Sequence, residues 1–383
     1  MDIKQFSVKA TGELLKLQTK AGWAFVPEVM PPKWKFPESM WPLLVEARTA
    51  LAALNGIGQS LDEPELLLKP LQNREALTSS SLEGTYVTPE QLLMYELDPR
   101  EPKASDDRVA DWKEVFNYSN ALRHGAERLS SLPLCSRLIK EMHAILMHGV
   151  RGRNKAPGEF RKWQVQIGSD ARFVPPPASH VDDLMTNLDQ YMNKSNDYDP
   201  LVRCYIVHYQ FETIHPFGDG NGRVGRSLLA LMISHLLGHT HPWLYMSAFY
   251  EKYRDEYVSK MFNVSTEGSW EEWIEFCLRG TLQQARDSIA RCKKFRELKK
   301  RYQEDAGTLT PRTYKIIEGL FTKPLVWVTH VAEQFSVSYP TAKSDLDRLV
   351  DADILRELPD SRPKAYYAPD VMKAAYHEGE EDD

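Results

Sequence analysis

Apolar residues recur at spacings of three and four over most of the chain, and this pattern predicts a mainly α-helical protein. The first such stretch begins at Leu44 and continues, with interruptions, to about Leu97. Within it, Thr88 and Pro89 mark a helix start, because threonine suits the N-cap and proline the first turn. Further amphipathic helices are expected over residues 107–126, 134–146, 200–214 and 269–304.

Two segments depart from the helical pattern. Residues 1–45 are rich in proline and tryptophan, and we expect them to wrap over other elements as irregular structure. Residues 163–174 alternate apolar and polar positions around turn-forming residues and end at three prolines, which predicts a short β-hairpin. An isolated hairpin is marginally stable in water, so it must lean on the rest of the fold. It is either a lid or substrate clamp or a hairpin without a function.

The composition changes after Gly307. Three short helical stretches are expected, followed by two strands around a turn, and this order resembles a winged helix-turn-helix. We therefore divide the chain into an N-terminal helical region, a helical core, a winged helix-turn-helix and an acidic tail that we expect to be disordered. Their bounds are residues 1–105, 106–305, 306–375 and 376–383.

Composition argues against several classes of protein. The hydrophobic share of 42% and the charged share of 27% are ordinary for a globular protein, and no apolar run approaches the ~20 residues that span a bilayer. The net charge of −6 gives no general attraction to nucleic acid or to an anionic membrane. The N-terminus lacks a secretory signal. Cys204 and Cys277 fall on apolar helical stripes, so we expect buried free thiols and a cytoplasmic location.

Residues 215–226 carry the strongest chemical signal, His-Pro-Phe-Gly-Asp-Gly-Asn-Gly-Arg-Val-Gly-Arg. Glycines allow positive φ and close backbone approach, so several N–H groups can converge on one anion. The apolar run 227–237 predicts a helix whose N-terminus faces this loop and favours phosphate. Arg223 and Arg226 lie three residues apart, where both can reach one polyphosphate. A plain turn with solvated charges does not need this whole set.

The same segment supplies acid–base and metal-binding side chains. His215 can take a proton near neutral pH, and Asp219 can hold a divalent cation. His208 lies on the apolar stripe of the preceding helix, so we expect it to be a buried, hydrogen-bonded histidine and not a second catalytic one. Phe217 is expected to anchor the loop in the core.

The loop resembles the signature of the Fic family, His-x-Phe-x-(Asp/Glu)-Gly-Asn-Gly-Arg-x-x-Arg, and matches it at every defined position. Upstream, Ser79, Glu83 and Gly84 match the family's inhibitory motif, Ser/Thr-x-x-x-Glu-Gly/Asn. The resemblance covers residues 30 to 290 approximately and implies a Fic-type helical core. It also implies that the hairpin at 163–174 is a flap that binds a target protein by β-augmentation. The family's usual reaction transfers AMP from ATP to a protein hydroxyl.

The resemblance implies a role for each site residue. His215 would accept the proton of an incoming tyrosine, serine or threonine hydroxyl, and Asp219 would hold Mg²⁺ against the α- and β-phosphates. Glu83 would occupy Arg226 and so inhibit ATP binding, unless it is simply a solvated residue at a helix end. The expected ATP-binding residues are Gly218, Gly220, Asn221 (a donor to the α-phosphate), Gly222, Arg223 (β-phosphate), Arg226 (γ-phosphate) and Tyr257.

Departures from the family pattern keep alternatives open. Tyr253 stands where relatives carry asparagine and Val258 where they carry a second tyrosine, so the identity of the nucleotide is open. The site could instead transfer another nucleotide or a phosphate, or remove AMP with Glu83 positioning water. A DNA-binding regulator that senses nucleotide is the alternative from another class.

The charge of the C-terminal region argues against DNA. Over residues 309–370 there are eight Lys or Arg and nine Asp or Glu, a net charge of 8 − 9 = −1. This favours a protein-interaction or target-recruiting role for the winged helix-turn-helix, with homo-oligomer formation left open. The basic residues that could still form a DNA-binding face are Lys343, Arg348, Arg356, Arg362 and Lys364.

Overall fold

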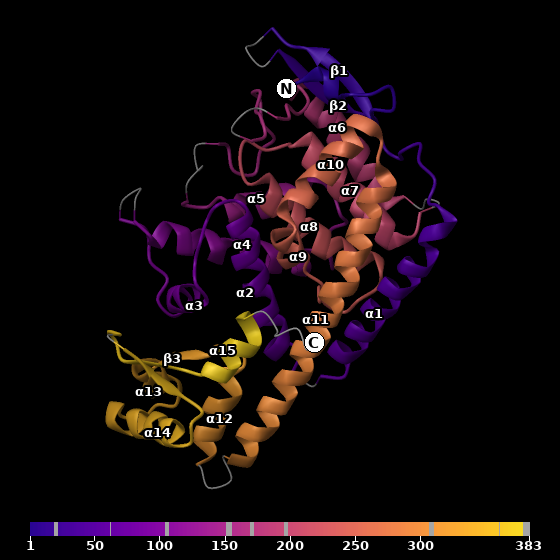
Figure 1. Ribbon diagram of the computed structural model, residues 1–383. Helices are drawn as coiled ribbons and strands as arrows, with labels where there is room; N and C mark the ends of the chain where they lie inside the picture. The colour runs from indigo at the N-terminus through magenta and orange to yellow at the C-terminus, as the bar shows by residue number, and fades with distance from the viewer. Residues whose placement is uncertain are drawn as a thin grey trace.

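The structure is a computed structural model of the whole chain. It describes residues 1–18, 22–61, 63–103, 107–150, 155–168, 172–194, 198–305, 310–359 and 361–377. The predicted acidic tail from residue 378 onward, and the predicted turn at 169–171, lie outside the described residues. The fold is mainly helical, as the apolar periodicity predicted (Figure 1).

The N-terminal part contains a β-hairpin that precedes the first helices. Its strands β1 and β2 pair antiparallel, with Gly12 opposite Pro27, so the expectation of irregular structure over residues 1–45 was wrong here. The prolines do not prevent pairing because they stand at the end of β2 or beyond it. The elements are η1 (Ile3–Gln5), β1 (Gly12–Lys16), β2 (Trp23–Pro27), η2 (Glu38–Met40), α1 (Trp41–Gln59), α2 (Glu65–Leu82) and α3 (Pro89–Leu97). The predicted Thr88 cap is present, as a reciprocal capping box with Gln91.

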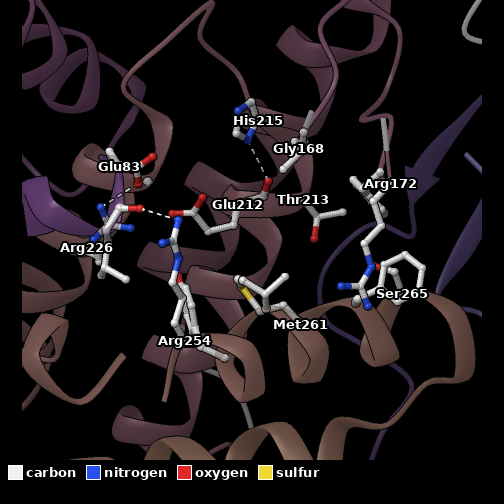
Figure 2. Close-up of a pocket in the computed structure, with 17 residues that line it drawn as sticks. Glu83, Gly168, Arg172, Glu212, Thr213, His215, Arg226, Arg254, Met261 and Ser265 are labelled. Carbon is white, nitrogen blue, oxygen red and sulfur yellow. Dashed lines mark hydrogen bonds and ion pairs between the residues drawn. The ribbon is translucent and has the colours of Figure 1, made fainter. Parts of the chain in front are cut away.

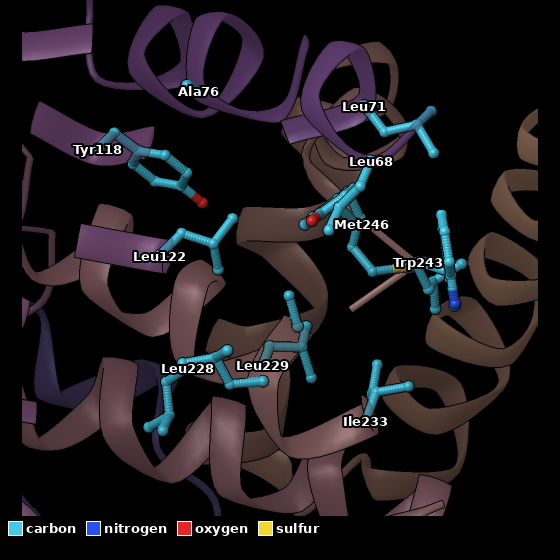
Figure 3. Packing of buried hydrophobic residues seen from close by; sticks show 14 of the residues in the cluster. Leu68, Leu71, Ala76, Tyr118, Leu122, Leu228, Leu229, Ile233, Trp243 and Met246 are labelled. Atoms are coloured by element: carbon cyan, nitrogen blue, oxygen red, sulfur yellow. The ribbon is translucent and has the colours of Figure 1, made fainter. Parts of the chain in front are cut away.

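The central helices surround two that are buried on nearly all sides, α7 and α8. Helix α11 extends past them and packs along much of the shorter helix α1 (Figure 1). Residues of α2, α4 and α8 meet in one hydrophobic cluster, among them Ala76, Tyr118 and Leu228 (Figure 3). The elements are α4 (Val109–Arg128), α5 (Ser136–Leu146), α6 (Ala178–Asn193), α7 (Pro200–Ile214), α8 (Asn221–Leu236), α9 (Ser247–Lys252), α10 (Arg254–Glu267) and α11 (Trp270–Asp305).

The predicted hairpin at 163–174 is present only as one antiparallel bridge, between Ile167 and Phe173. Regular strands do not extend from this bridge through the described residues on either side of it. The segment does lean on a neighbour: Val174 accepts a hydrogen bond of 2.9 Å from the backbone N–H of Phe25 in β2. The Phe25 and Phe173 rings also pack together, with centroids 5.6 Å apart. We call residues 163–174 the flap.

The C-terminal region contains the three helices and two strands that the sequence predicted, together with strand β3 and helix α15, which it did not. The strands form an antiparallel sheet in the order β3-β5-β4. A small apolar cluster, which includes Leu93, Trp327 and Met372, packs this sheet and α15 against α3. The assignment as a winged helix-turn-helix and the boundaries at 105 and 305 stay predictions. The elements are α12 (Pro311–Leu320), β3 (Leu325–Trp327), α13 (Val328–Gln334), α14 (Tyr339–Asp351), β4 (Arg356–Leu358), β5 (Ala365–Tyr367) and α15 (Pro369–Tyr376).

Two expectations about buried residues are confirmed. Cys204 and Cys277 are buried and carry free thiols. His208 is 2% exposed, and its Nε2 lies 2.9 Å from the hydroxyl of Tyr257. Within the described part of the chain, every helix is too short or too polar to cross a membrane.

Candidate active site

The motif at 215–226 is a tight loop between two buried helices. Helix α7 ends at Ile214, and His215 follows in the left-handed conformation with φ of 51°. Helix α8 begins at Asn221, directly after Gly220 with φ of 75°. The apolar run 227–237 predicted this helix, and both arginines were expected on its first turns. Arg223 and Arg226 do lie on the first turns of α8, near the N-terminal end of the helix dipole.

Asn221 fastens the loop to itself. Its Oδ1 accepts from the backbone N–H of Phe217 at 2.8 Å, and its Nδ2 donates to the carbonyl of Phe217 at 3.0 Å. The residue is 2% exposed. Both ends of the amide are therefore used inside the loop, while the second N–H of Nδ2 has no contact in these two bonds, and the role of Asn221 as a donor to the α-phosphate stays a prediction.

A second histidine, His143 of α5, packs against the loop and hydrogen-bonds to it. The sequence did not suggest this contact. Its Nδ1 accepts from the N–H of Gly158 at 2.8 Å, so its Nε2 carries the proton that points to the carbonyl of Asp219, 3.0 Å away. Its ring stacks on Phe217 with centroids 3.8 Å apart. Burial lowers the pKa of His143 to about 4, so this tautomer holds at neutral pH. Phe217 is fully buried, as expected of a loop anchor.

His215 is poised to accept a proton through Nε2. Its Nδ1 lies 3.3 Å from the carbonyl oxygen of Glu212. Because a carbonyl only accepts, Nδ1 carries the proton and Nε2 keeps its lone pair. Burial lowers the pKa of His215 to about 4, although the Glu212 carbonyl and the Glu83 and Asp219 charges act in the opposite direction. The imidazole is thus neutral at pH 7, with Nε2 free to accept a proton, and its role as the base stays a prediction.

Arg161 holds the left-handed turn at His215 in place. Its side chain is 2% exposed and donates from Nε to the carbonyl of His215 at 2.8 Å. Its two terminal nitrogens donate to the carbonyls of Trp163, Pro176 and Ile214. Burial lowers the pKa of Arg161 to about 10, so it remains charged at neutral pH. One guanidinium therefore connects the end of α7 to the start of the flap and to Pro176, just beyond the end of the flap.

Replacing Arg161 by methionine is expected to lower the free energy of unfolding by about 3 kcal/mol or more, because several buried carbonyls lose their donor at once. Urea denaturation of the purified protein measures this loss. Arg137→Met is the matched control: Arg137 makes a surface ion pair with Glu141 and its side chain is 72% exposed, so less than about 1 kcal/mol is expected. Equal destabilisation by the two variants would contradict the role given to Arg161.

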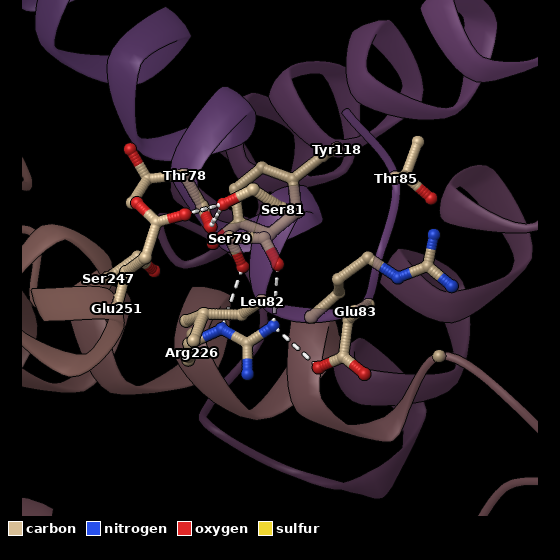
Figure 4. Close-up of polar contacts among 12 residues, drawn as sticks. Thr78, Ser79, Ser81, Leu82, Glu83, Thr85, Tyr118, Arg226, Ser247 and Glu251 are labelled. Atoms are coloured by element: carbon tan, nitrogen blue, oxygen red, sulfur yellow. Dashed lines mark hydrogen bonds and ion pairs between the residues drawn. The ribbon is translucent and has the colours of Figure 1, made fainter. Parts of the chain in front are cut away.

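Arg226 is held by the end of α2. Its Nε donates to Ser79 Oγ, and its Nη2 donates to the Ser79 carbonyl and to Glu83 Oε1, each at 2.8 Å (Figure 4). The Arg226 side chain is 3% exposed and that of Glu83 is 38% exposed. Burial acts to raise the pKa of Glu83, but the charge and hydrogen bond of Arg226, together with the charge of Arg223, lower the pKa below its usual range. The carboxylate is therefore ionised at neutral pH.

The helix end explains the spacing of the Ser79, Glu83 and Gly84 motif. Gly84 has φ of 86°, a conformation that favours glycine. Its N–H donates to Ser81, and the N–H of Thr85 donates to Ser80, the hydrogen-bond pair of a Schellman ending. Glu83 thus becomes the C-cap residue, one turn after Ser79, so both reach the same guanidinium.

Gly222 of the motif makes room for this ion pair. A Cβ at position 222 would overlap Glu83 Oε1 and crowd the Nη1 of Arg226. At position 218, a Cβ would overlap the ring of Trp163, so that glycine lets the flap close against the loop. These two glycines serve close approach, whereas Gly220 serves the positive φ at the start of α8.

Arg223 points away from the others and pairs with a residue that the sequence did not suggest. Its Nη1 donates to Glu114 of α4, and both side chains are 5% exposed. Thr85, just after the inhibitory motif, donates to the same Glu114 oxygen at 2.7 Å. Arg223 is therefore paired with a buried carboxylate, and its contact with the β-phosphate stays a prediction.

A cavity of about 380 Å³ opens beside this network (Figure 2). Glu83, His215, Gly222, Arg226 and Tyr257 line it, whereas Gly218, Asp219, Gly220, Asn221 and Arg223 do not. The flap contributes Ile167, Gly168, Arg172 and Phe173, and α10 contributes Arg254, Val258, Met261, Phe262 and Ser265.

Tyr257 lines the cavity, whereas Asp219 lies outside its lining. Tyr257 is 5% exposed and stacks on Tyr250 with centroids 4.2 Å apart, so most of its ring is already covered. The side chain of Asp219 is 45% exposed, and its Oδ1 accepts from the N–H of Gly220 at 2.6 Å. Among the described residues, no group of three or more His, Cys, Asp or Glu could hold a metal ion.

The buried α7–loop–α8 unit, with its glycine-rich turn and flap, gives the protein a Fic-type helical fold. A Fic family protein from Desulfovibrio desulfuricans G20 has this fold, with a TM-score of 0.56 and 20% identity over 88% of this chain and 98% of its own. Fic-1 (residues 134–508) from C. elegans matches with a TM-score of 0.52 and 20% identity, over 66% of this chain and 74% of its own. These likenesses concern the fold alone.

Sequence comparisons point to the same family. Residues 133–233 match the Fic/DOC family, and residues 41–127 match the Fic/DOC family N-terminal region. A probable protein adenylyltransferase of Aquifex aeolicus (strain VF5) is 31% identical over 179 residues, which are 46% of this chain and 51% of the relative. The protein adenylyltransferase Fic of Drosophila grimshawi is 28% identical over 194 residues, 50% of this chain and 38% of the relative. The chain thus spans about half the length of these curated relatives or less.

Proposed function

We propose that this protein is a protein adenylyltransferase, which transfers AMP from ATP to a tyrosine, serine or threonine hydroxyl of a target protein and of itself. The observation that carries the proposal is a neutral His215, with Nε2 available, at a cavity whose cation Arg226 is occupied by Glu83. The relatives named protein adenylyltransferase support the reaction type.

The proposed reaction balances without a redox partner. The hydroxyl oxygen of the target attacks the α-phosphorus of ATP, and the bond to the β-phosphate breaks, so pyrophosphate leaves. His215 Nε2 takes the hydroxyl proton, while Nδ1 keeps its own proton and donates it in a hydrogen bond to the Glu212 carbonyl. Arg226 binds the outer phosphates once Glu83 has moved off the guanidinium.

Mg²⁺ fits the site as a partner of the nucleotide. Asp219 is the exposed carboxylate of the loop and would hold the ion, with phosphate oxygens and water supplying the other ligands, as magnesium commonly requires. When bound, the ion neutralises charge on the departing pyrophosphate. The carboxylate's contacts to Gly220 and Arg223 keep it oriented along the loop.

The flap is the proposed binding segment for the target. Its single bridge leaves backbone groups near Ile167 that an extended peptide can pair with. Ile167 and Arg172 also line the cavity, so a peptide added at this edge would lie beside His215. The buried free thiols of Cys204 and Cys277 fit a cytoplasmic protein, and the oligomeric state is left open.

Labelled nucleotides test the reaction type directly. With label on the α-phosphate of ATP, the protein and its target are expected to become labelled, and with label on the γ-phosphate they are not. The reverse pattern would indicate phosphate transfer. Loss of a preloaded α-label without new transfer would indicate AMP removal, the role in which Glu83 positions water. Mass spectrometry of labelled peptides from lysate identifies the target and the acceptor residue.

Three of the five basic residues named for a DNA-binding face form ion pairs, which favours protein recruitment over DNA binding. Lys343 pairs with Asp347, Lys364 with Glu357 at 2.7 Å, and Arg348 lies 3.9 Å from Asp345. Phosphate binding would have to break these pairs before it could release counterions.

We therefore expect the double variant Lys343→Ala/Arg348→Ala to keep self-modification and to lose modification of the target. Labelling with α-labelled ATP, with and without lysate, measures both. Lys293→Ala/Lys294→Ala, on an exposed face of α11, controls for the loss of two charges. Tight, sequence-selective and steeply salt-dependent DNA binding by the full chain, lost in the first variant only, would overturn this preference.

A further inference from the structure

Glu212 contributes a carboxyl group to the lining of the cavity. It lies on α7, one helical turn before His215, and it lines the same cavity. Its Oε1 is shielded from solvent against Gly225 of α8 and has no hydrogen-bond partner among the described residues. A ligand in the cavity would therefore meet the other carboxyl oxygen, Oε2.

The lack of a side chain at Gly225 leaves room for the carboxyl group of Glu212. A Cβ at position 225 would overlap Glu212 Oε1, so only glycine on α8 leaves the group where it is. Position 225 is one of the two variable positions between the arginines of the motif. The chain therefore combines a glutamate on α7 with the glycine on α8 that accommodates it.

Glu212 interacts electrostatically with residues at both the expected phosphate end and the expected stacking end of the cavity. Arg226 and Glu83, at the proposed phosphate end, both act on its carboxyl group. Glu212 in turn acts on the hydroxyl of Tyr257, at the end where stacking was expected. Figure 2 shows Glu212 between His215 and Arg254, with Arg226 beside it. Burial raises the pKa of Glu212 to about 7, with Arg226 opposing and Glu83 adding to the rise, so ionised and neutral forms coexist near pH 7.

The chemistry of a nucleotide limits which of its groups the carboxyl group of Glu212 can bind. A carboxylate repels phosphate, so Glu212 requires a donor on the ligand. A nucleoside triphosphate offers donors at the ribose hydroxyls and, in adenine, at the exocyclic amine. The ribose is joined to the α-phosphate, which must lie at His215 for the proposed reaction, and Glu212 precedes His215 by three residues and lines the same cavity.

We propose that Glu212 is a ribose-binding residue, which accepts a hydrogen bond from a ribose hydroxyl and makes the enzyme prefer ribonucleotides to deoxyribonucleotides. The inference rests on the proposed function, because that function places the α-phosphate beside His215. It adds a specificity determinant that lies outside the Fic signature and was not expected from the sequence.

The test combines substitutions at Glu212 with removal of single hydroxyl groups from the substrate. ATP, 2′-deoxyATP and 3′-deoxyATP, each α-labelled, are compared in the Glu83→Gly protein and in the same protein carrying Glu212→Ala or Glu212→Gln. We expect the parent to prefer ATP to at least one deoxynucleotide by about 10–100-fold in kcat/KM. Glu212→Ala should abolish that preference by slowing ATP alone. Glu212→Gln, which keeps a neutral acceptor, should retain part of it.

Controls separate this inference from the proposed function and from misfolding. Glu127→Gln, an exposed carboxylate near the end of α4, should change nothing, and thermal unfolding of each variant reports on the fold. Equal losses with all nucleotides, or loss of discrimination against inosine triphosphate instead of deoxyATP, would overturn the role in ribose binding. Calorimetric binding of the same nucleotides is measured in parallel. A Glu212-dependent ribose preference in binding without any AMP transfer would contradict the proposed function and support Glu212, whereas transfer without that preference contradicts Glu212 alone.

Discussion

Replacing His215 by alanine is expected to lower the rate of AMP transfer by about 10²–10⁴-fold, the usual contribution of a general base. Its Nε2 is unprotonated at neutral pH because burial lowers the pKa to about 4 and Nδ1 donates to the Glu212 carbonyl. The phosphate-binding side chains do not depend on the imidazole, so nucleotide binding should persist. Transfer is measured with α-labelled ATP in the Glu83→Gly protein, and binding by calorimetry.

The matched control for this variant is His235→Ala, which removes an exposed histidine from the last turn of α8. It should transfer AMP at the parental rate. Because His215 has φ of 51°, its replacement also removes a residue from a left-handed position, and thermal unfolding must show that the loop survives. Near-parental transfer by a folded His215→Ala protein would remove this residue from the mechanism.

The loop and its inhibitory partner could be predicted because their signals are local. Gly84 ends α2 whatever lies around it, and this fixes Glu83 at the C-cap, one turn beyond Ser79. Likewise, the glycines around Asn221 imply a tight turn into a helix. Arg223 and Arg226 were expected on the first turns of this helix and lie there, although most of the side chains on these turns are buried.

The supports of the site could not be predicted because their partners are distant or belong to the backbone. Arg161 donates hydrogen bonds to backbone carbonyls that are 53 and 54 residues away. Every residue has a backbone carbonyl, so the sequence does not indicate which carbonyls will be the acceptors. Glu114 is 109 residues from Arg223, on a helix whose pattern shows only that it is amphipathic. His143 fits its position because it bonds to the N–H of Gly158 and to the carbonyl of Asp219, which are distant in the sequence and close in the fold.

Glu212 is different, because a signal was present. It is a carboxylate one turn before His215, on a helix with almost no polar face, so its burial near the site could have been inferred. The β1–β2 hairpin also had a signal, because a short apolar run, residues 23–26, follows the turn-forming Gly22, but the proline content of the segment obscured it.

Replacing Glu83 by glycine is expected to increase AMP transfer by roughly 10–100-fold, equivalent to about 1.4–2.7 kcal/mol, because it frees Arg226 for the nucleotide. The pair is buried on the arginine side and 38% exposed on the glutamate side, so the gain is set below that of a fully desolvated pair. Arg226 keeps its two hydrogen bonds to Ser79 and so stays oriented toward the cavity. Initial rates of self-labelling and target labelling with α-labelled ATP measure the increase.

A series at position 83 distinguishes restraint by charge from other roles. Glu83→Gln keeps the shape and the helix end, so it should be activated nearly as much as Glu83→Gly if the charge on Arg226 is what restrains the site. Glu83→Asp keeps the charge but withdraws it by one methylene, so intermediate activity is expected. Glu83→Gly/His215→Ala should show no gain, because release of Arg226 cannot replace the base. A folded Glu83→Gly protein that is slower than the parent would contradict inhibition by Glu83 and would favour a glutamate that positions water to remove AMP.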